Sequence, residues 1–587
     1  MLSHQPYRTA VATKTDRRTK GRLGLTLVEM MVSVVLTLLV VFALVRVFES
    51  LGSSVTDGRA TIELSGQLRS AAQTLRDDLR GLTVTTLPPR APDQGEGYLE
   101  LIDGPSTDSQ HFVQLAPGGI PDQIQMVRLS DASQSFIDQS IPQDGFLDGN
   151  SDAYDTTVGD VDDVLAFTTR SESQPFTGVI TDPRIQFKHV AGSLIPDPRA
   201  PTLILESTEA EVIWWLQVER NLATDGATTP VVEMLQGMSI AEQIANATTN
   251  LGNGNEAQRV LTAQRYPNFT DATLGTPVRS LHRRALLVRP DLDLSAIVLN
   301  GVDEVAAFLS NNDISVRVLR QGNTNVYHVA TNTLADLSIR QNRSCRPIRY
   351  WEGLASRQFP RTTRLSDQRS SEMLDAQSFL LRHVAMKDMV LDVNKDGTPD
   401  AVMLRKNKDV VLTDALAFDI QIWDPQALKR VAADGTVVLP SDPSYVTAPI
   451  EGTRGAYVDL GFAVQPKQLS NLPLQYHGLF GGFPNKKSGL PIVVGTNTGE
   501  SQGTATYGTW SSQYEHDGID QDKDGVVDQG TNCLDDNGFF GPDDPSEVET
   551  IAPYPHPLRG LKISLRTMDF GTRQVRQTSV THDFLPE

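Results

Sequence analysis

Cysteine is scarce in this chain, and the sequence signatures of several enzyme classes are missing from it. The 587 residues include two cysteines, Cys345 and Cys533, which lie far apart in the sequence, and whether they form a disulfide does not follow from the sequence. No C-x-x-C pair suggests a zinc site, and neither G-x-S-x-G nor H-E-x-x-H occurs. The ten histidines are scattered without the spacing of metal ligands. No motif identifies an enzyme, and we expect the protein not to be one.

Basic residues are also scarce once the first 24 residues are set aside. That short segment holds six Lys or Arg and one acid, whereas the rest of the chain holds 46 basic and 71 acidic residues. The acidic balance argues against a nucleic-acid partner and is typical of a soluble or cation-binding exterior. Hydrophobic residues make up 39% of the sequence, which is enough for a large folded core.

One apolar run stands directly after the basic segment. Residues 25–45 contain a single charge, Glu29, and a helix of this length is about 31 Å long, enough to cross the hydrocarbon core of a membrane. The positive-inside rule places residues 1–24 in the cytoplasm and the rest of the chain outside it. A cleaved secretory signal or a plain signal anchor has the same outline, and residues 50–52 (Ser-Leu-Gly) would suit ordinary signal peptidase.

Apolar residues at intervals of three and four continue beyond this run and predict an amphipathic helix. Gly81 and the pair Pro88-Pro89 are expected to end it. We therefore predict one helix over residues 25–80, with a membrane half and a second half, residues 46–80, that packs on the remainder of the protein. The apolar positions of the second half are Val47, Leu51, Val55, Leu64, Leu68, Ala71, Leu75 and Leu79.

From residue 81 onward, short alternating runs rich in β-branched residues predict strands. Residues 246–274 and 495–513, rich in Gly, Asn and Thr, are predicted to be loops inserted between strands. A helix followed by antiparallel strands indicates an α+β fold. The adjacent Trp214 and Trp215 are expected to serve ordinary β-core and edge packing. The predicted strands are residues 123–129, 162–170, 184–190, 211–219, 283–289, 314–320, 415–424, 456–464, 561–568 and 573–584.

The segment GLTLVE, from Gly24 to Glu29, resembles the processing motif of type IV prepilins. The resemblance implies that prepilin peptidase, a membrane-embedded aspartyl protease, cuts between Gly24 and Leu25 and methylates the new N-terminus. Leu25 stands where that family usually has Phe. A carboxylate within a membrane needs a partner. In this family the residue that matches Glu29 pairs with the N-terminal amine of a neighbouring subunit.

The resemblance also implies a pilin-like fold, in which a long N-terminal helix packs on a large antiparallel β-rich head, here residues 81–587 with long loop insertions. Three segments resemble the J-type minor pseudopilin of bacterial type II secretion: residues 162–170, the pair 211–219 and 280–289, and the closing residues 557–587. This implies a minor subunit that assembles with other pseudopilins at the inner membrane, with its head in the periplasm.

A head this large is hard to tile along a thin filament, so a place at the filament tip is expected. Two other interpretations remain open. One is a pilin of a type IV pilus or competence system. The other is a signal-anchored extracytoplasmic ligand-binding protein or enzyme.

Two acidic loops fit the pattern D-x-[DN]-x-D-G-x-x-D, in which oxygen atoms at positions 1, 3, 5, 7 and 9 wrap Ca²⁺ around a glycine turn. Both lack a bidentate Glu at position 12, so any calcium binding would be weak. The alternative is a solvated turn rich in Asp and Asn. The expected ligands are Asp392, Asn394, Asp396, Thr398 (carbonyl) and Asp400 in the first loop, and Asp520, Asp522, Asp524, Val526 (carbonyl) and Asp528 in the second.

Overall fold

The chain divides into two compact units, residues 1–62 and 63–587. The computed structural model describes residues 27–86, 95–103, 113–115, 124–126, 163–185, 187–190, 193–196, 203–218, 279–300, 304, 308–309, 311–321, 324, 326–343, 388–391, 401–404, 409–432, 434–440, 445, 452–462, 478–482, 485, 505–518, 520, 524–569 and 574–584.

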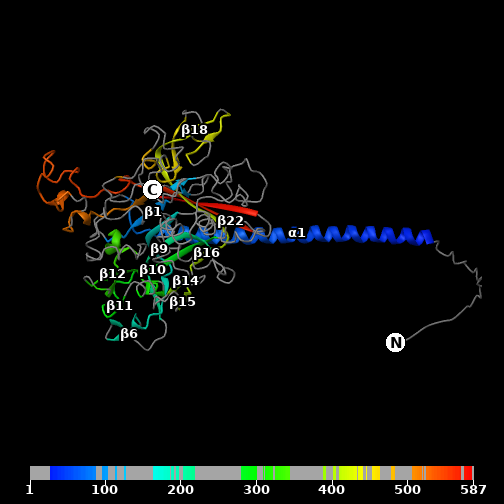
Figure 1. The fold of residues 1–587 in the computed structure, drawn as a ribbon, viewed down its shortest axis with the longest axis horizontal. Helices are drawn as coiled ribbons and strands as arrows, with labels where there is room; N and C mark the ends of the chain where they lie inside the picture. The colour runs from blue at the N-terminus through cyan, green and yellow to red at the C-terminus, as the bar shows by residue number, and fades with distance from the viewer. Residues whose placement is uncertain are drawn as a thin grey trace, which may run out of the picture. The chain divides into compact units, whose positions relative to one another are not determined.

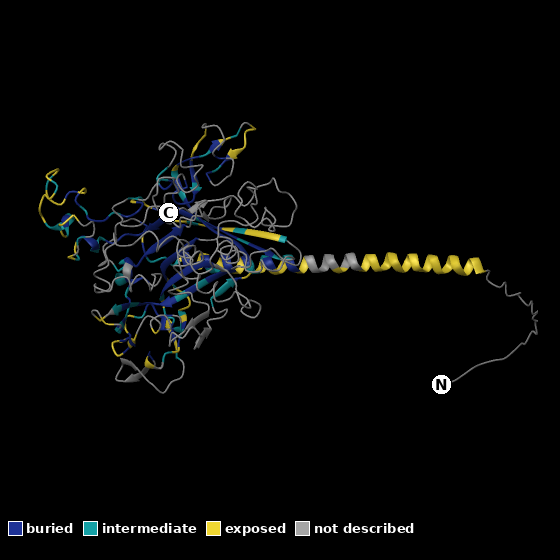
Figure 2. Ribbon diagram, in the orientation of Figure 1, coloured by how far each residue is buried: buried dark blue, intermediate teal, exposed yellow. Residues whose placement is uncertain are grey.

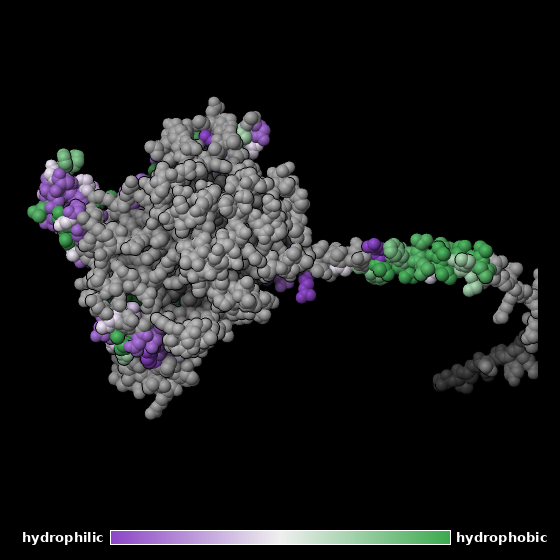
Figure 3. Space-filling model, in the orientation of Figure 1, coloured by the Kyte–Doolittle hydropathy of each residue, from purple (hydrophilic) through white to green (hydrophobic). Residues whose placement is uncertain are grey.

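Helix α1 (Leu27–Arg80) is continuous over 54 residues (Figure 1). Its first 22 residues, Leu27–Phe48, are exposed, and they form the one helix among the described residues that is long and apolar enough to cross a membrane (Figure 2). Figure 3 shows the corresponding hydrophobic surface. Because this stretch lies near the N-terminus, it is compatible with a membrane anchor and with a signal sequence. The predicted helix over residues 25–80 is confirmed from Leu27 onward.

Helix α1 ends where a strand of the second unit meets its last turn. Gly81 N–H still reaches the carbonyl of Asp77 at 3.3 Å, while the carbonyl of Gly81 accepts a 2.7 Å hydrogen bond from the N–H of Arg170. A Cβ atom at residue 81 would lie 2.2 Å from the Arg170 carbonyl oxygen, so glycine is required by this close approach. The predicted end of the helix at Gly81 is confirmed.

The second unit contains a six-stranded antiparallel sheet in the order β16-β10-β9-β4-β1-β21. The last turns of α1 pack on one face of this sheet, where Leu68, Leu75 and Leu79 share a core with Phe167 and Trp214. The burial of Leu64, Leu68, Ala71, Leu75 and Leu79 confirms the predicted apolar stripe over that part of the helix. The prediction is wrong at Val47, which is 54% exposed, and the side chains of Leu51 and Val55 lie outside the description. The strands are β1 (Leu99–Asp103), β4 (Val164–Arg170), β9 (Glu209–Val218), β10 (Arg279–Leu287), β16 (Val410–Leu412) and β21 (Ala505–Gly508).

A four-stranded antiparallel sheet, in the order β20-β17-β22-β23, contributes Phe418, Ile420 and Leu561 to the same core. Its last two strands form a hairpin that pairs without a register shift from Gly560↔Asp583 to Asp569↔Gln574. The strands are β17 (Ala415–Leu428), β20 (Arg454–Val458), β22 (Gly560–Asp569) and β23 (Gln574–Asp583).

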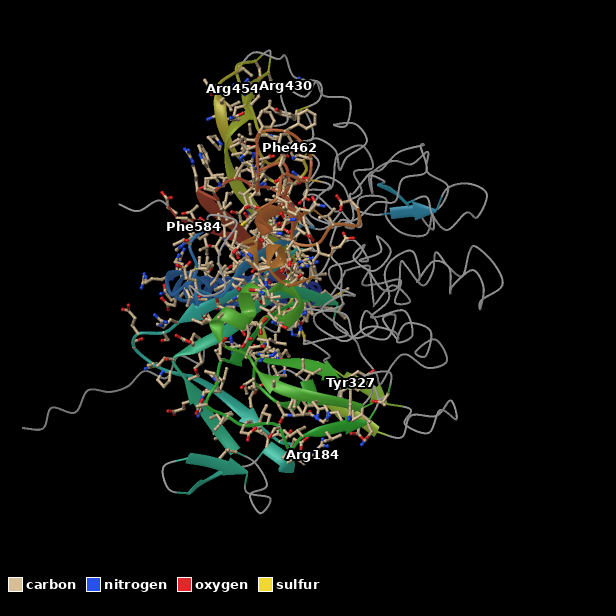
Figure 4. The ribbon with its side chains drawn as sticks, turned by 90° about the vertical axis from the view of Figure 1, so that its left-hand side faces the viewer. Arg184, Tyr327, Arg430, Arg454, Phe462 and Phe584 are labelled. Carbon is tan, nitrogen blue, oxygen red and sulfur yellow. The ribbon has the colours of Figure 1, made fainter. Side chains whose placement is uncertain are left out.

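A three-stranded sheet packs on a second core, which also contains Ile180 and Leu287. Tyr327 of this sheet, labelled in Figure 4, is buried in that core. It consists of β11 (Val298–Asn300), β12 (Val316–Arg320) and β13 (Val326–Thr331). The short helices α6 (Leu334–Ser338) and η4 (Arg340–Asn342) follow. Two-stranded pairs complete the fold: β2 (Val113–Leu115) with β3 (Ile124–Met126), β5 (Phe176–Ile180) with β8 (Leu203–Ser207), β6 (Phe187–Val190) with β7 (Ser193–Pro196), β14 (Asp388–Leu391) with β15 (Ala401–Leu404), and β18 (Arg430–Val431) with β19 (Val437–Val438).

An α+β fold is observed, and most predicted strands are present with shifted ends. The prediction of a loop over residues 495–513 is wrong in part, because β21 lies within it and the 3₁₀ helix η9 (Ser512–Glu515) begins before its predicted end. Four residues flanked by Gly and Thr are too short a run to signal a strand, and the pairing partner of β21 is the distant β1. Residues 183–185, predicted in part as strand, form the 3₁₀ helix η2 (Pro183–Ile185) before β6. The predicted loop 246–274 lies outside the described residues.

Candidate functional sites

The processing motif falls at the boundary of the described chain. Gly24 and Leu25 lie outside the described residues, whereas Glu29 lies in the first turn of α1 with its side chain exposed. A carboxylate in that turn is favoured by the helix dipole. At the other end of the apolar stretch, the guanidinium of Arg46 lies over the ring of Phe42, 5.5 Å from its centroid.

The C-terminal end of α1 is attached to the sheet through one buried carboxylate. Asp78, 4% exposed, accepts hydrogen bonds from Arg283 Nε at 2.7 Å, from Arg283 Nη2 at 2.6 Å and from Trp214 Nε1 at 2.9 Å. Burial alone lowers the pKa of Arg283, but the hydrogen bonds and the charge of Asp78 outweigh it and raise that pKa. Thr169 Oγ1 also donates to the backbone carbonyl of Asp78 at 2.7 Å. These contacts fix both the rotation of the helix about its axis and its position along that axis relative to the sheet.

The opposite face of the six-stranded sheet carries a buried ion network. Glu100 on β1 is fully buried and accepts hydrogen bonds from Arg340 Nη2 at 2.6 Å and from Arg343 Nη1 at 2.5 Å. Arg343 also lies over the ring of Tyr98, 4.1 Å from its centroid, and donates to the carbonyl of Thr509 at 3.2 Å. The segment after α6 is thereby joined to β1 and to the residue that follows β21.

The local sequence around α6 explains why Arg340 and Arg343 lie against the sheet. Thr333 and Asp336 form a capping box at the start of α6, with the Asp336 N–H donating to Thr333 Oγ1 at 3.0 Å. Leu334 and Leu337 then pack on the sheet beside Trp215. Once these two leucines are buried, η4 brings Arg340 over β1.

A second buried carboxylate lies on the same face. Glu211 on β9 accepts hydrogen bonds from the Tyr98 hydroxyl at 2.7 Å and from Ser315 Oγ at 2.7 Å. Trp215 on β9 stacks on His282 of β10, with ring centroids 5.1 Å apart. Both Trp214 and Trp215 are fully buried, which confirms their role in the core. Their expected role at an edge is wrong, because β9 is an interior strand of the sheet.

The first acidic loop, Asp392–Asp400, lies outside the described residues. The strands on either side of it, β14 and β15, pair up to Leu391↔Ala401, so the loop connects the two strands of a hairpin. Its predicted ligands Asp392, Asn394, Asp396, Thr398 and Asp400 stay a prediction.

The second acidic loop is described except at Asp522 and its neighbours. Asp520 Oδ2 accepts a 3.1 Å hydrogen bond from the N–H of Gly525, whose φ is +102°, and Asp524 Oδ1 accepts one of 2.9 Å from the N–H of Val526. Both carboxylate oxygens of Asp528 accept from the N–H of Gly518 at 3.1 Å. These are contacts of a turn rich in Asp.

Over the ranges that the structure describes, no group of three or more His, Cys, Asp or Glu is placed to hold a metal ion. Calcium therefore stays a prediction for both loops. Cys533 is exposed and forms no disulfide with another described residue. Cys345 lies outside the described residues.

A scan against protein-family models matched none, and searches of the curated proteins and of the solved structures found no match.

The buried charges of the sheet are the residues that sequence patterns did not reveal. For Asp78 the sequence holds a weak indication of a buried partner. An acid in the last turn of a helix interacts unfavourably with the helix dipole, so a stabilising contact elsewhere is expected. Glu100 and Arg340 are 240 positions apart, and no periodicity links them.

Proposed function

We propose that this protein is a pilin-like subunit, processed by prepilin peptidase, and specifically a minor subunit of a type II secretion pseudopilus that occupies the filament tip. One observation carries the proposal: α1 is a single helix whose exposed apolar stretch, Leu27–Phe48, has Glu29 in its first turn, and whose last turns bury apolar side chains in an antiparallel β-rich head. An anchor that served only to tether a soluble domain would not need to continue as the core helix of that domain.

The proposal gives a reason for the carboxylate at residue 29. A charged side chain in a membrane segment costs about 2.5 to 3.5 kcal/mol at the helix centre, so it is retained where it has a function. Cleavage after Gly24 produces an α-amine at Leu25, four residues before Glu29. In a bundle of such helices, the amine of one subunit neutralises the Glu29 carboxylate of the next. The partners are then prepilin peptidase, other pseudopilins and the inner membrane.

Processing is tested by mass spectrometry of the mature N-terminus. We expect the chain to begin at a methylated Leu25, and Gly24→Phe to leave the full-length precursor in the membrane. A mature chain that begins at Ser53 would instead establish ordinary signal cleavage. An unprocessed chain would establish the signal anchor.

Assembly is tested with Glu29→Gln. The neutral amide is cheaper in lipid, so the variant inserts at least as well as the natural protein, but it is expected to join the filament poorly. Glu63→Gln is the matched control, since it makes the same chemical change at an exposed position of α1 beyond the apolar stretch. Equal incorporation of both variants would contradict the pairing of Glu29.

Calcium is proposed as a ligand of the Asp520–Asp528 loop. Binding to the folded state alone would stabilise the protein by roughly 2.7 kcal/mol at a hundredfold excess over Kd. We expect the full chain in detergent to melt at a higher temperature in calcium than in chelator, with Mg²⁺ a poor substitute.

The double variant Asp520→Asn with Asp524→Asn should remove most of that difference. Asp434→Asn is the control, because Asp434 is also an exposed turn acceptor, with its Oδ1 2.9 Å from the N–H of Thr436. Coincident melting curves for the natural protein in calcium and in chelator would leave both loops as acidic turns.

A further inference from the structure

The segment between Asp524 and Leu558 presents two phenylalanines to solvent. Phe539 is 68% exposed and Phe540 is 94% exposed, and they are the exposed phenylalanines among the described residues of the second unit. Single exposed apolar residues are ordinary, but adjacent exposed aromatic rings are the residue type that anchors protein interfaces. Leu534, in the same turn, is 60% exposed. We refer to Leu534, Phe539 and Phe540 as the aromatic tip.

Hydrogen bonds fix the backbone on both sides of the aromatic tip. The N–H of Gly538 donates to Asp535 Oδ1 at 2.6 Å, and the N–H of Phe539 donates to Asn537 Oδ1 at 2.7 Å. At the base of the turn, the N–H of Cys533 donates to Asp543 Oδ1 at 2.9 Å. The rings are therefore held on an ordered turn, and a partner need not order the backbone when it binds.

The base of the segment is attached to the body of the second unit. The buried Glu515 accepts hydrogen bonds from the N–H groups of Glu549 at 2.9 Å and Thr550 at 3.1 Å, and Trp510 Nε1 donates to Thr550 Oγ1 at 3.1 Å. Glu547, also buried, accepts from the N–H of Asp536 at 2.7 Å. The segment that carries the aromatic tip is thus attached to the second unit by buried hydrogen bonds at its base.

Phe540 adopts a left-handed backbone, with φ +60°, which is unusual for a bulky residue. In this conformation the Phe540 ring is exposed to solvent, so its apolar surface contributes no burial free energy to folding. An observed outlier of this kind is a reason to look for a function of the exposed side chain.

Charge identifies the kind of partner. No Lys or Arg occurs between Asp524 and Leu558, whereas eight acids do: Asp524, Asp528, Asp535, Asp536, Asp543, Asp544, Glu547 and Glu549. Figure 3 shows the described surface of this segment as largely hydrophilic with apolar patches. An anionic lipid surface would be repelled by these carboxylates. A protein with an apolar pocket and a basic rim would match both the rings and the charge.

We propose that the aromatic tip is a docking element, which inserts Phe539 and Phe540 into an apolar pocket with a basic rim on a partner protein. The inference does not depend on pilin-like assembly, because it uses only contacts within the second unit.

The test begins with the full chain in the cells that make it. A photo-crosslinking benzoylphenylalanine replaces Phe540, and in a control it replaces Val437, which is 55% exposed on β19. We expect one discrete protein adduct from position 540 and none of that size from position 437. An adduct with lipid, the same adducts from both positions, or no adduct from position 540 would overturn the proposal.

The cross-linked protein is then identified, purified and titrated with the full chain in detergent. Phe540→Ser should weaken binding about tenfold or more while leaving the melting temperature unchanged. Asp535→Asn with Asp543→Asn keeps the turn acceptors but removes two charges, and it should weaken binding several-fold at low salt. Binding should also weaken from about 0.05 M to about 0.5 M salt. Binding that is indifferent to Phe540→Ser, or that strengthens when the charges are removed, would overturn the proposal.

Discussion

The two faces of the six-stranded sheet are buried by opposite chemical means. The face toward α1 is apolar, with Leu165, Phe167 and Val212 packed against helix leucines, and the carboxylate of Asp78 lies at its margin. The other face buries Glu100 and Glu211 among apolar side chains, each with hydrogen-bonding partners. Both faces exclude water equally well, since Trp214 on one and Trp215 on the other are fully buried.

The difference shows two ways of attaching a segment to a sheet. A long helix can bury a stripe of leucines, and the apolar area removed from water stabilises the contact at about 25 cal/mol per Å². The short segment from Leu334 to Arg343 has few apolar residues to offer. It is held instead by hydrogen bonds and ion pairs, which are directional and therefore fix its position more narrowly than apolar packing does. The loss of any one partner leaves a buried charge or polar group unpaired, which lowers the stability of the fold.

The largest loss is expected from Glu100→Ala, which leaves two buried arginines without their carboxylate. Removing one partner of a buried ion pair costs about 3 to 5 kcal/mol. Urea unfolding of the full chain in detergent, followed by tryptophan fluorescence, measures the loss. Arg317→Ala is the control, since its ion pair with Asp336 is partly exposed and should cost about 1 kcal/mol or less. Similar losses for both variants would remove the distinction between this network and a surface ion pair.

On the helix-facing side, Leu75→Ala is expected to cost about 3 kcal/mol, because Leu75 is fully buried and its removal leaves a cavity. Ile62→Ala provides the control, as Ile62 is 76% exposed on the same helix. The comparison of melting temperatures decides whether the second half of α1 is part of the core. A shift of less than a degree for Leu75→Ala would mean that it is not.

Asp78→Asn tests the ion pair between Asp78 and Arg283 on the helix-facing side of the sheet. The variant keeps an oxygen acceptor but loses the charge that faces Arg283, and we expect a loss of about 2 kcal/mol because Arg283 remains 20% exposed. Its neighbour Asp77, 55% exposed and 3.7 Å from Arg80, is the matched position, where Asp77→Asn should cost about 0.5 kcal/mol or less. Amide hydrogen exchange near Gly81 should quicken in Asp78→Asn alone.

The smallest effect is expected from Tyr98→Phe, which removes one donor to Glu211 while Ser315 still serves it. The ring remains in place under Arg343, so the loss should be about 1 to 1.5 kcal/mol. Combining it with Ser315→Ala should cost more than the sum of the two single losses, because Glu211 then loses both of these donors. Additive losses would show that the two hydrogen bonds act independently.

Much of the fold could be predicted because it depends on local periodicity. The unbroken apolar run predicted α1 to within two residues of its observed start, and intervals of three and four residues predicted its continuation to Arg80. Alternation predicted β4, β9, β17 and the β22–β23 hairpin. β21 was missed because four residues carry too little pattern, and its strand character depends on pairing with β1. The processing motif was found because it is contiguous in sequence, although Gly24 and Leu25 lie outside the described residues.

The sequence by itself determined the long helix, its apolar first half, the place of Glu29 in its first turn and the acidic character of the remainder. These properties reside in neighbouring residues, where helical spacing and charge act over a few positions. Only the tertiary structure decided that Asp78 meets Arg283, that Glu100 meets Arg340 and Arg343, and that the rings of Phe539 and Phe540 remain in water. The partners of a buried charge are chosen by which strands lie side by side, and strand order depends on the packing of the whole core.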